Sequence, residues 1–161
     1  MPIKKNLISY TVDLTEELDE LNITGNKRKQ AAEAAGNAAL SFILEYTESA
    51  QSPVKNKPKG FQELSAEYKK FKRKKGKGTR ANLRLNEEML PSMKVVADKE
   101  SFTIKITDRD EKLKAHGHNT GGNKRLPKRQ FLPDDDNKEE LRTDIQKAYL
   151  KMLEEYKNGR E

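Results

Sequence analysis

The chain has 161 residues, 33% hydrophobic and 37% charged, and its 33 lysines and arginines outnumber 26 acids to give a formal net charge of +7. The absence of cysteine excludes disulfides and thiol chemistry, and no apolar run reaches the length of a membrane span or a signal peptide core, so we expect a soluble protein that is not secreted by a cleaved signal. The length fits a single domain, residues 1–161, with a thin hydrophobic core. Either parts of the isolated chain are disordered, or the chain buries further apolar surface against neighbouring copies.

The N-terminal third predicts a strand followed by two helices. Apolar residues alternate with polar ones from Ile8 to Leu14, as in a half-buried strand, and the acidic segment Leu14–Asn22 has leucines at helical spacing. After a break at Thr24–Asn26, a long helix is expected over Lys27–Glu48. One face of it carries Ala32, Ala35, Ala39, Phe42, Ile43 and Tyr46, and Gly36 indicates close approach of another backbone.

The next segment leads into a strongly basic run. Residues 49–60 contain two prolines and predict a loop, and then Phe61, Leu64, Tyr68 and Phe71 have the spacing of a short helix. Residues 69–84 hold nine bases and no acid, and predict a mobile basic loop with Lys72, Arg73, Lys74, Lys75, Lys77 and Arg80. This loop could contact phosphates, meet an acidic neighbour, or simply be solvated.

A hairpin is predicted in the middle of the chain. Residues 94–97 and 102–107 form its strands, residues 98–101 connect them, and Phe102, Ile104 and Ile106 share one face.

Residues 112–133 are the second acid-free basic segment, and they can be interpreted as a metal site, as a nucleic-acid loop or as the docking arm of an assembly protein. They hold both histidines and six bases, and predict one or two helical turns over 110–116, a loop over 117–124 and a short strand at Gln130–Leu132. Asp134–Asn137 are N-cap candidates for a last helix, whose apolar stripe is Leu141, Ile145, Ala148, Tyr149, Met152 and Tyr156.

These elements predict an α+β domain, in which the N-terminal strand and the central hairpin form a small antiparallel sheet packed by two or three helices, with long basic loops. The charges are divided between regions. Outside the two basic segments, 18 bases face 26 acids, so an acidic body carries basic loops. Such polarity indicates contact with something anionic, either nucleic acid or the acidic face of another subunit.

Catalytic and metal sites have weaker support. His116 and His118 with Asp134–Asp136 could bind zinc or manganese, and with Asn119 and Asn123 they could serve a nuclease. The flanking lysines and arginines would repel a cation, however, and no phosphate loop or nucleophile elbow is present. We therefore expect no enzyme, no cofactor and no metal.

The second half of the chain resembles tailed-phage virion-morphogenesis proteins of the tail-completion and head–tail joining type. Leu85–Met93 resembles the segment that leads into the family's sheet. In that segment a leucine and a turn are followed by a second leucine, a serine and an apolar residue. Ala115–Gly121 is similar to its Ala–His–x–x–Gly loop, and Leu126–Leu132 to its Pro–x–Arg–x–Phe–Leu motif before a terminal helix. Gly60–Leu64 is similar to its Gly–aromatic–x–x–Leu element, and the resemblance covers roughly residues 60 to 157.

The resemblance implies a non-enzymatic virion protein of the neck or tail end, made in the host cytoplasm. Copies would form a homo-oligomeric ring, expected to be a hexamer, around the DNA channel as a connector or tail terminator. The ring would contact other neck, connector, tail-tube or sheath proteins, with DNA only passing through and no membrane contact.

Within this interpretation, the docking arm supplies the interface to a neighbouring subunit or to the sheet. Its residues are Pro127, Lys128, Arg129, Phe131 and Leu132, with Phe131 and Leu132 as anchors and Arg129 paired with an acid. His116 and Gly121 are expected to fix the loop. The alternative hypothesis is a non-specific DNA-binding protein that acts through residues 69–84.

Overall fold

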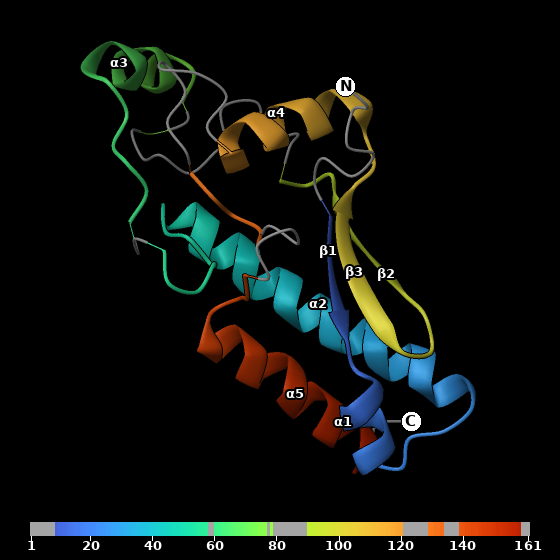
Figure 1. The fold of residues 1–161 in the computed structure, drawn as a ribbon. Coiled ribbons are helices and arrows are strands. Elements are labelled where there is room, and N and C mark those ends of the chain that lie inside the picture. The colour runs from blue at the N-terminus through green and yellow to red at the C-terminus, as the bar shows by residue number, and fades with distance from the viewer. Residues whose placement is uncertain are drawn as a thin grey trace.

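The computed structural model describes residues 9–57, 60–76, 78, 90–120, 129–133 and 139–158, and it has the predicted α+β fold (Figure 1). In chain order the elements are β1 (Ser9–Asp13), α1 (Thr15–Glu20), α2 (Asn26–Glu48), α3 (Ala66–Lys74), β2 (Met93–Ala97), β3 (Ser101–Ile106), α4 (Arg109–Thr120) and α5 (Thr143–Lys157). The predicted N-terminal strand, short acidic helix, long helix and central hairpin are all confirmed.

The three strands form an antiparallel sheet in the order β1-β3-β2. Its register places Val12 opposite Phe102 and Val95 opposite Ile104. Phe102, Ile104 and Ile106 are completely buried, whereas the alternate residues of β3 are only partly covered. The predicted alternation of the hairpin therefore defines an inner face toward the helices and an outer face.

Helix α2 packs on the inner face of the sheet, and α5 runs alongside α2 (Figure 1). The α2 residues that permit this close approach are small and buried: Ala31, Ala32, Ala35, Gly36 and Ala39. A Cβ atom on Gly36 would lie 2.5 Å from Val95 Cγ1 and 3.0 Å from Phe102. The glycine is therefore required by packing between helix and sheet, as its position in the alanine-rich face predicted.

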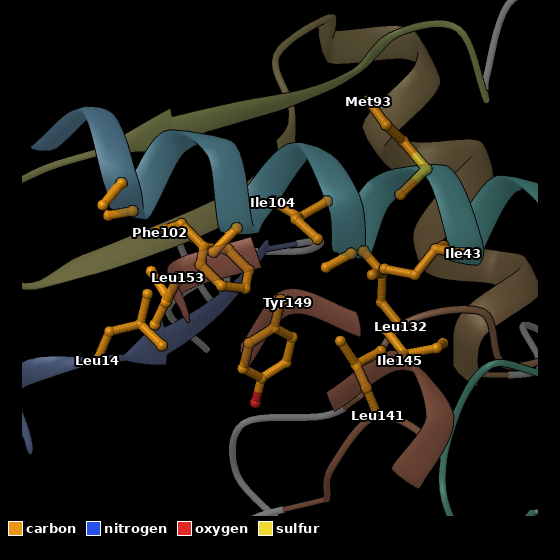
Figure 2. Close-up of a cluster of buried hydrophobic side chains, with 14 of the residues drawn as sticks. Leu14, Ile43, Met93, Phe102, Ile104, Leu132, Leu141, Ile145, Tyr149 and Leu153 are labelled. Carbon is orange, nitrogen blue, oxygen red and sulfur yellow. The ribbon is translucent and has the colours of Figure 1, made fainter. Parts of the chain in front are cut away.

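The core lies between α2, α5 and the sheet (Figure 2). The ring of Tyr149 meets that of Phe102 edge to face, with centroids 5.4 Å apart, which joins α5 to β3. Burial raises the pKa of Tyr149 to about 12, with smaller contributions from Glu17 and Glu140. Leu132, which follows α4 in the chain, lies in the same cluster near Ile145 (Figure 2).

The short helix α3 begins later and ends later than predicted. Phe61 and Leu64 precede it, because Ser65 caps the helix by accepting a hydrogen bond from the Tyr68 amide at 3.2 Å. Lys69–Lys74 are helical, so the predicted basic loop over residues 69–84 is wrong for its first part. Lys77 and Arg80 of that loop lie outside the described residues.

Helix α4 corrects the predicted docking arm. The helical turns predicted over residues 110–116 are confirmed, but the helix continues through Gly117 and His118 to Thr120, where a loop was expected. His116, assigned to fixing a loop, is a half-buried residue of this helix with a partner, and Gly121 lies outside the described residues.

Helix α5 begins at Thr143, with Arg142 as its N-cap residue, so the predicted capping by Asp134–Asn137 is wrong. The chain before it is held extended, since Leu141 bridges to Val54 and the Arg142 amide donates to the Pro53 carbonyl at 2.8 Å. Ile145, Tyr149 and Leu153 are the buried residues of α5. No helix within the described parts of the chain is long and apolar enough to span a membrane.

Candidate functional site

The segment Arg129–Pro133 is held against α4 by the side chain of Asn119. Asn119 Oδ1 accepts hydrogen bonds from the amides of Phe131 at 2.9 Å and Leu132 at 3.0 Å, and its Nδ2 donates to the Leu132 carbonyl at 3.0 Å. The Arg129 amide donates to the His118 carbonyl at 2.7 Å. The short strand predicted at Gln130–Leu132 is therefore wrong, because an asparagine side chain occupies the backbone groups that a neighbouring strand would bind.

Gln130 attaches the other side of this segment to the 49–60 loop. Its carbonyl accepts from Ser52 Oγ at 2.6 Å. Its side-chain Nε2 donates to the Leu132 carbonyl at 3.1 Å and to a carboxylate oxygen of Glu139. Sequence reasoning missed Asn119, Ser52 and Gln130 as positioning residues, since nothing in their spacing indicates which distant backbone they meet.

Phe131 and Leu132 were predicted as anchors to a neighbouring subunit or to the sheet. Both side chains are buried in the core of their own chain, with 0% and 1% of their surface exposed. In this structure neither one is available to a second subunit, so the segment Arg129–Pro133 anchors the chain to itself. Pro127 and Lys128, the other predicted interface residues, lie outside the described residues.

Arg129 connects this segment to the start of α3. Its Nε donates to the Gln62 carbonyl at 3.0 Å and its Nη2 to the Glu63 carbonyl at 3.5 Å, and only 5% of the residue is exposed. Burial lowers the pKa of Arg129. The predicted pairing of Arg129 with an acid is not seen among the described residues, and backbone carbonyls take that place.

Two further basic side chains, those of Lys72 and His118, lie near Arg129. Lys72 of α3 is only 2% exposed, and burial, followed by the Arg129 charge, lowers its pKa. His118 Nδ1 is buried without a hydrogen-bond partner in the described structure, and burial, with Arg129, lowers the pKa of His118 to about 4. Lys72 was predicted to face DNA or a partner, but its burial beside Arg129 removes it from that surface.

The outward side of α3 combines aromatic and basic residues. Tyr68 and Phe71 are 39% and 46% exposed, with ring centroids 5.9 Å apart, and Lys75 Nζ lies 5.7 Å from the Phe71 centroid. Lys70, Arg73 and Lys74 of the same helix are exposed, as is its C-cap residue Lys75. The spacing of Tyr68 and Phe71 predicted a helix, but it did not indicate that both rings would be exposed on it.

No group of three or more histidine, aspartate or glutamate side chains in the described part of the chain could hold a metal ion. Asp134–Asp136, which were considered with His116 and His118 as ligands, lie outside it.

The chain was compared with protein-family models, with curated proteins and with solved structures. No family model, no curated protein and no solved structure matches it.

Proposed function

We propose that the chain is a structural protein of a tailed-phage virion, which forms a ring at the neck or tail end and completes the tail or joins it to the head. The single observation that carries the proposal is the seating of Arg129–Pro133 on Asn119. Two motifs of the sequence resemblance, one around His116–Asn119 and one around Arg129–Leu132, meet there through four hydrogen bonds made by backbone and side-chain atoms. Because the two segments are hydrogen bonded to each other, there is a physical reason for both motifs to occur in the same chain.

The distribution of burial supports an assembly role. Helix α3 stands apart from the layers formed by α2, α5 and the sheet (Figure 1), and 39% of Tyr68 and 46% of Phe71 are exposed on it. Apolar surface of this kind on a charged protein is typical of a surface that a partner buries. In the proposed ring, the partners are further copies and neighbouring neck, connector or tail proteins, while DNA passes through the channel without specific contact.

The proposal is tested on virions and on purified protein. Mass spectrometry of purified virions should detect the chain, and light scattering after size-exclusion chromatography should detect a closed oligomer, alone or with the neighbouring virion proteins. A strict monomer in every mixture, together with absence from virions, would contradict the proposal.

A second candidate is non-specific DNA binding through α3. The observation that favours it is the pair of exposed rings, Tyr68 and Phe71, beside exposed bases, since aromatic faces and positive charge together bind single strands. It predicts binding that falls steeply with salt. The variant Lys70→Glu/Arg73→Glu/Lys74→Glu should abolish this binding, whereas Lys29→Glu/Lys151→Glu/Lys157→Glu, with the same change in net charge at exposed sites, should not.

A further inference from the structure

Three basic side chains converge where α3, α4 and the segment Arg129–Pro133 meet. Lys72 comes from α3, His118 from the last turn of α4, and Arg129 from the segment itself, and we name these three residues the basic cluster. The C-terminal end of α4 is turned toward α3 (Figure 1). Burial, and after it the charge of Arg129, lowers the pKa values of Lys72 and His118, so Arg129 lies within electrostatic reach of both.

Two members of the basic cluster are almost completely buried, with 2% of Lys72 and 5% of Arg129 exposed. Removing a cation from water is costly, and two cations close together add their repulsion. The carbonyls of Gln62 and Glu63 accept hydrogen bonds from Arg129, but these neutral groups do not cancel its charge. An anion bound between the bases would therefore stabilise this part of the fold.

The basic cluster has hydrogen-bond donors left for a further acceptor. Arg129 uses Nε and Nη2, while its Nη1 makes no hydrogen bond to the described residues. His118 Nδ1 is buried without a partner in the described structure, and it donates when it carries a proton. Tyr68, four residues before Lys72 on the same side of α3, is within electrostatic reach of Arg129 and is 39% exposed, so the cluster lies beneath a side chain that reaches solvent.

Negative groups around the basic cluster do not offset its charge within the described structure. The described acids of the neighbouring segments pair with other lysines: Glu63 with Lys69, Glu111 with Lys114 and Glu139 with Lys57. Glu67, in the first turn of α3, is exposed, where solvent screens its charge. The negative end of α4 carries roughly half a charge, and the His118 carbonyl there already accepts from the Arg129 amide.

We propose that the basic cluster is a binding site for a phosphate group, free or as a terminal monoester, with Arg129 and His118 as hydrogen-bond donors and Lys72 as a further positive charge. A phosphate group carries roughly two negative charges at neutral pH and at least three acceptor oxygens, so it can meet donors from three elements at once. A carboxylate offers one charge and two oxygens. A small group suits bases that are almost completely covered, whereas the continuous backbone of DNA needs exposed ones.

The native chain tests the site directly, because it has two histidines and His118 belongs to the cluster. The imidazole resonances are followed by NMR as the pH is changed, in inorganic phosphate and in chloride of the same ionic strength, and the spectrum of His118→Gln assigns them. A bound phosphate favours the protonated ring, so the titration midpoint of His118 should rise by roughly 1–2 pH units, and that of His116 should not respond to the anion. The same His118 midpoint in both salts and in the ester described below would overturn the proposal.

Thermal unfolding gives a second, independent measurement. A phosphate ligand that binds the folded chain should raise its Tm above the value in chloride of equal ionic strength. Lys72→Met, which keeps an apolar side chain of similar length in the buried position, should lose most of this rise. Lys74→Met, at an exposed position of the same helix, should keep it. Circular dichroism shows that both variants are folded, and an equal rise in the two would overturn the site.

The source of the phosphate group is distinguished with a short oligonucleotide that carries a 5′-phosphate and with the same oligonucleotide without it. A His118 shift with the phosphorylated form alone supports a terminal monoester, and a shift with inorganic phosphate alone supports the free ion. Equal shifts with both oligonucleotides would show contact with the DNA backbone, and an equal shift with acetate would show a carboxylate site. Either result overturns the proposal. These measurements use purified protein, so they are separate from the search for the chain in virions.

Discussion

Asn119 hydrogen bonds both backbone groups of Leu132: its Oδ1 accepts from the Leu132 amide and its Nδ2 donates to the Leu132 carbonyl, each at 3.0 Å. A side chain of α4 thus satisfies buried backbone groups that none of the strands described in the structure pairs with. This relationship fixes the direction in which the segment Arg129–Pro133 enters the core.

Replacing Asn119 by alanine should lower the free energy of unfolding by roughly 2–4 kcal/mol, because buried amides and a carbonyl of residues 131 and 132 lose their partner. Urea unfolding followed by circular dichroism measures the change. The matched control is Asn37→Ala at an exposed position of α2, where alanine should raise stability by a few tenths of a kcal/mol at most. Equal stability of the two variants would contradict the assigned role.

Gly36→Ala should destabilise the protein although alanine is the better helix former. The added methyl would stand 2.5 Å from Val95 Cγ1 and 3.0 Å from Phe102, so α2 or the sheet must shift. We expect a net loss of roughly 1–3 kcal/mol, measured by thermal or urea unfolding. Ser41→Ala on the exposed side of α2 is the control, and a more stable Gly36→Ala variant would show that the sheet accommodates the methyl group.

Acidification should destabilise the fold through His118. Its pKa is about 4 when folded and 6.5 when unfolded, so between these values the unfolded chain binds more protons, and the stability present above pH 6.5 is lost as the pH falls toward 4. By pH 5 the loss should reach roughly 2 kcal/mol. Urea unfolding between pH 7.5 and pH 5 should show this loss in the native chain and a smaller one in His118→Gln. Identical pH slopes would contradict the burial of a neutral histidine.

Arg129→Met should loosen α3 while leaving the core in place, because the guanidinium bonds to the carbonyls of Gln62 and Glu63 are lost. Hydrogen exchange followed by mass spectrometry should show faster exchange in Lys69–Lys74 and little change in α2. The control is Arg73→Met, an exposed arginine of α3 itself, which should leave exchange in α3 almost unchanged. Equal exchange rates in the two variants would show that Arg129 does not hold the helix.

The sequence predicted the elements whose periodicity matches their burial. Phe102, Ile104 and Ile106 alternate as the inner face of β3 requires, and the alanines of α2 with Gly36 predicted the close approach to the sheet. The sequence did not predict elements that depend on contacts between residues far apart in the chain. Residues 117–120 are poor helix formers that nevertheless continue α4, where Ala115 is buried and Asn119 binds Leu132.

The candidate site was predicted only in part. The pattern identified Arg129, Phe131 and Leu132 as residues of importance, but local spacing cannot distinguish an anchor in a neighbouring subunit from one in the chain's own core. Likewise, the run of charges around Lys72 did not indicate that this lysine would be buried beside Arg129. Both differences arise from contacts between segments far apart in the sequence.

The central claim, a ring at the neck or tail end of a virion, is tested most directly by locating the chain. Gold-labelled antibodies against it, applied to virions made by the genome that encodes it, should mark one position at the head–tail junction or the tail end. Label on the capsid or along the whole tail, or particles without any label that contain none of the chain by mass spectrometry, would contradict the account.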